Sequence, residues 1–570
     1  MSDPARRALM AHPGSTHAAR PPAHSFHVLW VGCRCCLVLL SVCVLGAARG
    51  AEPSLPPIDK VEIRDRAFLV NGQPFFPIMG WLQPPRNLAL LKECGFNTTA
   101  GYWGGSGWTT NAAEYVEAAR RAGLYAVMPF QPALKGNPNL LGYIHDDEPD
   151  LDRKVSDARI EPGKGLHLNP STPMYKLVDG DLTSWTVLDP LDGSSVTIRL
   201  AEPAVIVSVG VALTVSPGLS LPREMTFESG GKELLKVAPV PRNGRQKFAL
   251  LQPVRIEELT VRVTAITPGR EVYGSLGEIE AWDVEGANVL LSPPRQVPQA
   301  RPEVTLRKYA AFKAADATRP VFMTLTGDFL PFFKKWSEAE RTSMYPAYIQ
   351  ASDVVGYDIY PIYGWNKPDW LDLNHDATEL LLRLAGPRPV YAWIETSKGG
   401  QWTGPLEGQH DVTPEDIRAE VWMCLCRGAT AIGYFTHVWK PQFAEFGATD
   451  ANRRALREIN TQITRLAPAL LGRPLPEPVA LAAQSDVKLD LMARQSGQDV
   501  FLFTVNYDAR LKNTDATITL PGLRAGEPVE VVDENRTLSS QDGAFKDTYA
   551  PLAVHVYRVR TARPGTPAPH

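Results

Sequence analysis

Residues 319–360 read RPVFMTLTGDFLPFFKKWSEAERTSMYPAYIQASDVVGYDIY. The apolar run Arg319–Gly327 predicts a buried strand, Glu338–Ala351 predicts a helix, and Val354–Tyr360 predicts a second buried strand. Apolar strands joined by a helix are typical of parallel β/α units, because the strands of a parallel sheet are covered on both faces. This stretch therefore predicts a parallel sheet wrapped by helices.

The same alternation continues on both sides of this stretch. Six more predicted strands lie at 75–81, 97–103, 124–130, 140–148, 389–396 and 429–437, and predicted helices separate most of them. The last helix is predicted at 452–466, with Pro468 just beyond its end. The two β/α parts together have roughly 250 residues, the usual size of a (β/α)₈ barrel. A doubly wound sheet is the alternative, but the chain lacks the Gly-rich phosphate loop of that fold.

The alternation stops between the fourth and fifth predicted strands. Residues 155–283 carry short alternating runs separated by turn residues, such as 196–200 and 205–211, and show no helical pattern. This predicts an all-β sandwich inserted into the barrel, followed by a Pro-rich linker at 292–302. A β pattern returns between 476 and 560, which predicts a second, smaller sandwich.

The N-terminus has the pattern of a secretory signal peptide. Arginines precede an apolar run at 36–45, and small residues follow at 46–51. The run is short for a membrane span of ~20 residues, which favours cleavage over an uncleaved anchor. We therefore expect export to the periplasm or the extracellular space, with no integral membrane association after cleavage. The predicted organisation is a signal peptide at 1–50, barrel strands one to four at 51–152, an inserted sandwich at 153–290, barrel strands five to eight at 291–472, a C-terminal sandwich at 473–560, and a disordered tail at 561–570.

Charge and cysteine content narrow the function classes. The chain has 59 Lys and Arg against 62 Asp and Glu, so it lacks the excess of basic residues expected of a nucleic-acid binder. Beyond the leader only Cys94, Cys424 and Cys426 remain, which match neither a disulfide framework nor a zinc spacing. We expect them to be small buried apolar residues. The sequence leaves the oligomeric state open.

Two glutamates end predicted barrel strands. Glu148 closes the fourth strand in GYIHDDEP (142–149), and Glu395 closes the seventh in PVYAWIET (389–396). Barrel enzymes carry their catalytic groups at the carboxyl ends of strands, and strands four and seven face each other across the mouth. Glycosidic bond cleavage needs a proton for the leaving oxygen and an anion for the oxocarbenium-like centre. We therefore predict Glu148 and Glu395 as a catalytic pair that requires no redox cofactor or catalytic metal.

Aromatic residues gather at the same predicted strand ends. Rings stack on the apolar C–H faces of sugars, and polar groups beside them fix the orientation of the sugar. The predicted substrate-binding residues are Asp147, Trp81, Trp103, Tyr360, Trp393, Trp402, His437 and Trp439.

These motifs resemble the clan A glycoside hydrolases. FLVNGQPFFPIMG (68–80) and KECGFNT (92–98) are similar to the entry segments of β-galactosidase- and mannanase-like members, and the resemblance covers both barrel halves. It implies a retaining mechanism in which Glu148 is the acid/base and Glu395 the nucleophile. Most members carry Asn before the acid/base, where this chain has Asp147, so the sugar stays unassigned. A non-catalytic carbohydrate-binding protein on a degenerate barrel, and another barrel hydrolase or lyase that uses the same carboxylates, are the alternatives.

The predicted insertion resembles the coagulation-factor type C, or discoidin-like, domains. The resemblance rests on LVDGDLTSW (177–185) and GEIEAW (277–282). It implies carbohydrate binding and a structural calcium held by Asp179, Asp181 and Glu278, whose carboxylates are the hard oxygen ligands that calcium prefers. A role for these acids in capping turns is the alternative.

Overall fold

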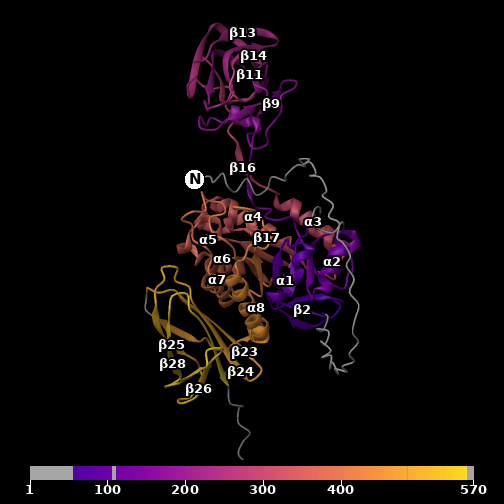
Figure 1. Cartoon of the computed structure of the whole chain (residues 1–570), viewed down its shortest axis with the longest axis vertical. Helices are drawn as coiled ribbons and strands as arrows, with labels where there is room; N and C mark the ends of the chain where they lie inside the picture. The colour runs from indigo at the N-terminus through magenta and orange to yellow at the C-terminus, as the bar shows by residue number, and fades with distance from the viewer. Residues whose placement is uncertain (1–54, 105–110, 484–485, 561–570) are drawn as a thin grey trace, which may run out of the picture. The chain divides into compact units, whose positions relative to one another are not determined.

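The computed structural model describes residues 55–104, 111–483 and 486–560, in two compact units (Figure 1). Unit 1 comprises Met1–Leu151 and Ala300–His570, and unit 2 comprises Asp152–Gln299. The predicted leader at 1–50 and the predicted tail at 561–570 lie outside the described residues. In the described part of the chain, no helix is long and apolar enough to cross a membrane.

Unit 1 contains a closed barrel of eight parallel strands, as predicted. Residues such as Tyr391 and Trp393 fill its interior, where they lie against Gly356 and Gly433 of the neighbouring strands. The barrel closes where β20 pairs with β4. The barrel strands are β4 Ile78–Trp81, β5 Thr98–Ala100, β6 Tyr125–Pro129, β7 Leu140–Ile144, β17 Val321–Thr326, β18 Val354–Asp358, β19 Val390–Glu395 and β20 Ala431–Phe435.

Outer helices follow most barrel strands, and side-chain caps fix where several begin. Asn111 accepts a hydrogen bond from the Glu114 N–H at the start of α2, and Ser337 and Thr413 form capping boxes at the starts of α4 and α7. The α-helices are α1 Leu88–Glu93, α2 Ala112–Arg121, α3 Pro302–Ala315, α4 Glu338–Gln350, α5 Pro361–Trp365, α6 Leu373–Ala385, α7 Pro414–Arg427 and α8 Asp450–Leu470. Short 3-10 turns of unit 1 lie at η2 Pro85–Asn87, η3 Pro132–Leu134, η5 Gly327–Phe329, η6 Pro331–Phe333 and η7 Pro368–Trp370.

Several element boundaries differ by a few residues from the sequence prediction, and two of the differences bear on the argument. The strand β7 ends at Ile144, so Glu148 lies in the loop beyond it, because the backbone leaves the sheet before the turn at Pro149. Pro468 lies inside α8 rather than beyond it, three residues before the C-cap Leu471. The three cysteines of the described chain are free and buried, as predicted.

Two further groups of strands belong to unit 1. An antiparallel sheet, β1 Val61–Arg64, β2 Ala67–Val70 and β3 Gln73–Phe75, precedes the barrel. The C-terminal region forms two sheets whose residues Met492, Phe503 and Val505 are continuous with the barrel core, and Trp422 of α7 stacks on Phe503. Their strands are β21 Arg473–Pro474, β22 Ala480–Ala483, β23 Leu489–Ser496, β24 Asp499–Asn506, β25 Thr514–Thr519, β26 Pro528–Val531, β27 Arg536–Ser539, β28 Ala544–Tyr549 and β29 Val554–Arg560.

Unit 2 is all-β apart from one 3-10 turn, η4 Met174–Leu177, and has its own apolar core. Its main sheet has seven antiparallel strands, and the long strands β11 and β14 bend at irregularities in their pairing. Its first and last strands, β8 and β16, pair with each other. Unit 2 therefore begins and ends at the same place. The strands are β8 Asp152–Val155, β9 Arg159–Pro162, β10 Thr186–Leu188, β11 Ser195–Leu213, β12 Leu221–Ser229, β13 Lys232–Val237, β14 Gly244–Thr267, β15 Gly274–Trp282 and β16 Arg295–Pro298.

Candidate active site at the barrel mouth

Acidic residues meet at the carboxyl ends of β7 and β18. Asp147 and Glu148 follow β7, Asp358 is the last residue of β18, and all three are half-buried. Tyr360 is buried beside them. Burial and the negative charges of Asp358, Asp147 and Glu148 raise the pKa of the Tyr360 hydroxyl well above its ordinary value. These four residues therefore share one electrostatic environment.

Asp147 holds its proton more firmly than an exposed aspartate. Burial, followed by the charges of Glu148 and Asp150, raises its pKa well above the usual range. Asp150 anchors this loop, because it accepts hydrogen bonds from the Thr326 N–H (2.9 Å), the Thr326 hydroxyl (2.7 Å) and the Tyr345 hydroxyl (3.0 Å). The loop after β7 is thus tied to the end of β17.

The backbone at Glu148 is left-handed, with φ +46°. This conformation is uncommon for a residue with a β-carbon, and the following Pro149 disfavours it further. Such strain costs on the order of 1–3 kcal/mol and persists only where the surroundings hold it. Here the Pro149 carbonyl accepts hydrogen bonds from the Ala300 N–H (2.8 Å) and the Tyr348 hydroxyl (3.3 Å). The strained residue therefore stands in a loop that is fixed on both sides.

The barrel interior below these acids is polar and aromatic. The Trp393 Nε1–H donates to Thr324 Oγ1 at 3.1 Å, and Thr324 Oγ1 lies 2.9 Å from the Tyr391 hydroxyl. Burial raises the pKa of Tyr391, and the charges of Asp147 and Asp358 raise it further. Asp147, which follows β7, and Asp358, which ends β18, therefore both raise the pKa of the same buried hydroxyl, although β7 and β18 are not adjacent strands.

Glu395 ends β19, but its carboxylate is enclosed. Its exposed fraction is 0%, and its two oxygens accept the backbone N–H groups of Ile362 (2.9 Å) and Tyr363 (2.6 Å) at the start of α5. Burial raises the pKa of Glu395 to about 7, and Glu420 of the outer helix α7 lies against it. Burial and the charge of Glu395 raise the pKa of Glu420, so Glu420 is the protonated partner. The carboxylate of Glu395 is thus turned towards α5 and α7, and its role as nucleophile stays a prediction.

The predicted aromatic residues form three groups. Trp81 and Trp393 lie with ring centroids 5.0 Å apart, and Trp402 packs on Tyr360 at 5.7 Å. Trp103, 51% exposed, stacks on His437 at 5.8 Å.

His437 links this last group to the barrel wall. Its Nε2 lies 3.1 Å from the Leu82 carbonyl oxygen, and burial lowers the pKa of His437 to about 4, so the ring is neutral at physiological pH. Trp439 lies 6.3 Å from the His437 ring and packs on Phe443 at 4.8 Å. Trp103 is thus a half-exposed ring beside this pair, at the carboxyl end of the barrel.

Sequence reasoning missed Asp358, Tyr391 and Asp150. Asp358 lies near the end of the strand predicted at 354–360 and ends the observed strand β18, so the rule that selected Glu148 and Glu395 could have found it. Tyr391 carries no such signal, because in the sequence it is one apolar-strand residue among several.

In unit 2 the structure brings Asp179 and Glu278 together. Burial and the neighbouring Asp179 raise the pKa of Glu278 to about 9, and its Oε1 accepts the Gly180 N–H at 2.7 Å. The Asp181 side chain instead accepts the N–H and hydroxyl of Thr183, which caps a turn. Across the described residues, no group of three or more acidic, histidine or cysteine side chains is arranged to hold a metal. Glu278 Oε2 is buried without a hydrogen bond, so Asp179 and Glu278 are the residues that would hold a cation here.

No protein-family model matches the sequence, and no curated protein matches it. Similar solved structures include a family 32 carbohydrate-binding module from Clostridium perfringens NanJ in complex with galactose, at 11% identity, covering 23% of this chain and 98% of that one, with a TM-score of 0.19. They also include an α-amylase from Geobacillus thermoleovorans complexed with acarbose, at 12% identity, covering 46% of this chain and 58% of that one, with a TM-score of 0.32. At these scores the likeness assigns neither substrate nor residue roles to this chain.

Proposed function

We propose that the chain is a glycoside hydrolase whose reaction takes place at the barrel mouth, between the Asp147–Glu148 pair after β7 and Asp358 at the end of β18. One observation carries the proposal: half-buried Asp147 and Glu148 follow β7, and half-buried Asp358 ends β18 on the other side of β17, all at the carboxyl end of the closed barrel. Perturbed carboxyl groups gathered in this way at the carboxyl end of a barrel are typical of a catalytic site.

The roles of acid/base and nucleophile follow from the charges of these carboxyl groups. Burial and the charges of Glu148 and Asp150 raise the pKa of Asp147, so Asp147 retains a proton for the leaving oxygen. Asp358 supplies the anion that attacks the anomeric carbon, and ionised Asp147 then takes a proton from the water that completes a retaining double displacement. Tyr360, with its raised pKa, stays a neutral donor beside Asp358. The substrate is an oligo- or polysaccharide, which the exposed Trp103 supports as a stacking platform.

In this proposal Glu395 is a positioning residue. Its carboxylate fixes the first turn of α5, and α5 begins directly after Tyr360. A change at Glu395 would therefore alter the placement of Tyr360 and lower the stability of the barrel. The assignment that the clan A resemblance implies, with Glu395 as the nucleophile, is the competing version of the same function.

The deciding experiment compares single variants of the full chain. Hydrolysis is measured on a panel of 4-nitrophenyl and 2,4-dinitrophenyl glycosides, together with the release of reducing sugar from polysaccharides. Asp358→Asn should lose turnover on every substrate that the wild type cleaves. Asp147→Asn and Glu148→Gln should lose about 10²–10⁴-fold on 4-nitrophenyl substrates, and less on the dinitrophenyl ones, because a good leaving group needs no proton.

Asp146→Asn is the matched control. Asp146 is the exposed neighbour of Asp147 and pairs with Lys308, so this variant should keep wild-type activity. A folded but inactive Glu395→Gln beside an active Asp358→Asn would overturn our choice of carboxylates and favour Glu395 as the nucleophile. Circular dichroism and melting curves establish that each variant is folded.

A second candidate function is carbohydrate binding without hydrolysis. The enclosed carboxylate of Glu395 favours it, because the position that should carry the nucleophile has no open face. For unit 2 we propose carbohydrate binding on the discoidin-like resemblance, with Asp179 and Glu278 holding a structural calcium. Retarded migration of the wild-type chain in polysaccharide gels, without any sugar release over long incubation, would favour this function over hydrolysis.

A further inference from the structure

A cavity of about 240 Å³ in unit 1 is rich in arginine, and we call it the arginine cavity. It is lined by Arg66, Glu379, Leu382, Arg383 and Arg427. It lies at the amino ends of the barrel strands, since Arg66 Nε donates to the Gly386 carbonyl at 2.8 Å and the Arg66 carbonyl accepts the Thr430 hydroxyl at 2.5 Å. Gly386 lies four residues before β19 and Thr430 directly before β20, so the cavity lies at the opposite end of the barrel from the candidate active site.

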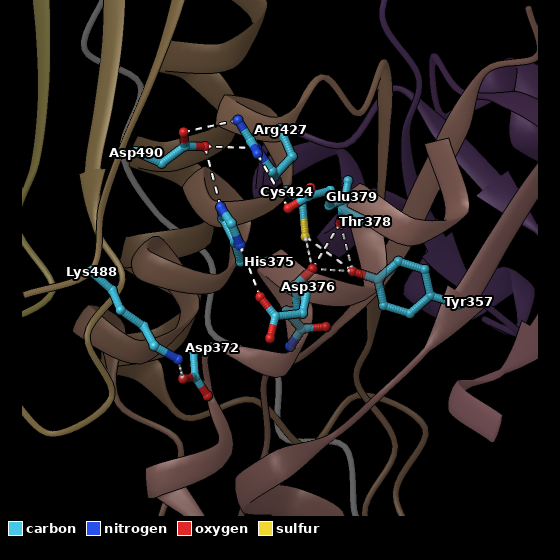
Figure 2. Close-up of polar contacts among 11 residues, drawn as sticks. Tyr357, Asp372, His375, Asp376, Thr378, Glu379, Cys424, Arg427, Lys488 and Asp490 are labelled. Atoms are coloured by element: carbon cyan, nitrogen blue, oxygen red, sulfur yellow. Dashed lines mark hydrogen bonds and ion pairs between the residues drawn. The ribbon is translucent and has the colours of Figure 1, made fainter. Parts of the chain in front are cut away.

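One wall of the arginine cavity is fixed by ion pairs. Arg427 Nε lies 2.8 Å from a carboxylate oxygen of Asp490 on β23, and its Nη1 lies 3.3 Å from Glu379 on α6 (Figure 2). Asp490 also lies 3.3 Å from His375 Nε2. The Arg427 guanidinium is therefore held in a set orientation by two elements besides its own helix.

The other guanidinium groups have no such neutralisation. In the part of the chain that the structure describes, no carboxylate forms an ion pair with Arg66, Arg383 or Arg494. Arg494 of β23 lies behind the wall, with Nη2 4.0 Å from the β-carbon position of Gly428, the residue after Arg427. Burial and the positive charge of Arg66 lower the pKa of Arg494, so these two like charges repel each other. The cavity lining thus holds three guanidinium groups and one carboxylate, that of Glu379.

We propose that the arginine cavity binds a compact oxyanion, phosphate or sulfate, either as the free ion or as an ester group on a saccharide. Partly buried charges of one sign are unfavourable unless a group of the opposite sign joins them. The planar fork of a guanidinium matches the oxygens of such an ion, and the hydrogen bonds between them are charge-assisted. A neutral sugar would leave the repulsion between Arg66 and Arg494 in place.

The fold prepares this site in advance. Arg66 comes from the turn between β1 and β2, Arg383 from α6, Arg427 from α7 and Arg494 from β23. Binding therefore needs little ordering of the chain, which favours affinity. A bound oxyanion would also connect the N-terminal hairpin and the C-terminal sheets across the outer helices.

The test uses the full chain and sodium sulfate, sodium phosphate or sodium chloride at matched ionic strength. Melting curves and titration calorimetry compare the wild type with Arg383→Gln, which changes an exposed side chain, and with Arg454→Gln, an exposed arginine of α8 that serves as the control. The wild type should show a saturable rise in Tm with sulfate and phosphate beyond the effect of chloride. Arg383→Gln should weaken the Kd by about tenfold or more, and Arg454→Gln should behave as the wild type.

A second variant separates binding from folding. Arg494→Gln should raise the Tm in chloride, because it removes the repulsion from Arg66, and should reduce the response to sulfate. Equal responses to all three salts, or an unchanged sulfate affinity in Arg383→Gln, would overturn the proposal. Galactose 6-sulfate compared with galactose and inorganic sulfate separates the two sources: tighter binding of the ester than of the free ion identifies a sulfated saccharide, and the reverse identifies the free ion.

Discussion

Replacing Asp490 by Asn should loosen the contact between the C-terminal sheets and the barrel. Asp490 accepts hydrogen bonds from Arg427 of α7 at 2.9 Å through Nη2, and it lies 3.3 Å from His375 Nε2 of α6 (Figure 2). The His375 ring stacks on Tyr507 with centroids 3.8 Å apart. Asparagine keeps the shape of the side chain and removes its charge, so the substitution tests the electrostatic part of this contact alone.

The magnitude follows from the burial of the pair. Breaking a fully buried ion pair from one side costs about 3–5 kcal/mol, whereas exposed pairs contribute about 0–1 kcal/mol. The side chains of Asp490 and Arg427 are 13% and 29% exposed, which places this pair between the two limits. Arg427 also keeps its contact with Glu379. We therefore expect a loss of about 2–3 kcal/mol, or roughly 30–150-fold in the equilibrium constant for opening the contact.

The assay is urea unfolding followed by tryptophan fluorescence. Trp422 stacks on Phe503 of β24 at 5.8 Å, so the environment of this tryptophan changes when the contact opens. Asp486→Asn is the control, because Asp486 forms an exposed pair with Lys512 in the same region and should contribute little. If Asp490→Asn unfolds at the same urea concentration as the wild type and the control, the electrostatic reasoning is refuted.

Three further predictions concern other parts of the chain. Burial lowers the pKa of His375, but the carboxylates of Asp376 and Asp490 outweigh this effect and raise it above 6.5. The stability that His375 contributes should therefore be complete below pH 6.5 and lost as the pH rises through the folded pKa. His375→Gln should flatten this pH dependence in urea titrations between pH 5 and 8, and an unchanged profile would argue against the prediction. The folded pKa of Glu278 is raised to about 9, so unit 2 should lose stability as the pH rises from 4.5 towards 9. Calcium should restore this stability in melting curves of the wild type but not of Glu278→Gln. Gly433→Ala would place a β-carbon 2.2 Å from the Trp393 ring, so it should lower the free energy of unfolding of the barrel by at least about 1–3 kcal/mol; a Tm equal to that of the wild type would contradict this packing.

The barrel was predictable because its strands are apolar and separated by helices. Runs such as Val321–Thr326 and Val390–Glu395 are buried along their whole length, and a buried parallel strand leaves this signature in the sequence. The position of an acid at a strand end was equally visible. The direction of its side chain was not, because Glu395 and Asp358 occupy equivalent positions in the sequence and only the folded chain turns Glu395 towards α5.

Local backbone detail explains the rest of the difference. The sequence of α5 contains Pro361 and Gly364 and shows no helical pattern. Its backbone N–H groups at Ile362 and Tyr363 nevertheless donate to the Glu395 carboxylate. The left-handed backbone at Glu148 depends on contacts with Ala300 and Tyr348, which are far away in the sequence. The arginine cavity joins Arg66 to Arg427, and no periodicity links residues so distant.

The pairing of β8 with β16 has a consequence for how the chain matures during synthesis. Strands β4–β7 leave the ribosome first and wait for β17 while the whole of Asp152–Gln299 is made, about 150 residues, which takes on the order of 10–30 s. During this wait β7 is an unpaired edge, a ready template for wrong partners. Once unit 2 has folded, its ends lie side by side, and the remaining gap is short: the Ala300 N–H reaches the Pro149 carbonyl at 2.8 Å. If unit 2 folds early, it shortens the effective loop between β7 and β17. This lowers the entropy cost of closing the barrel.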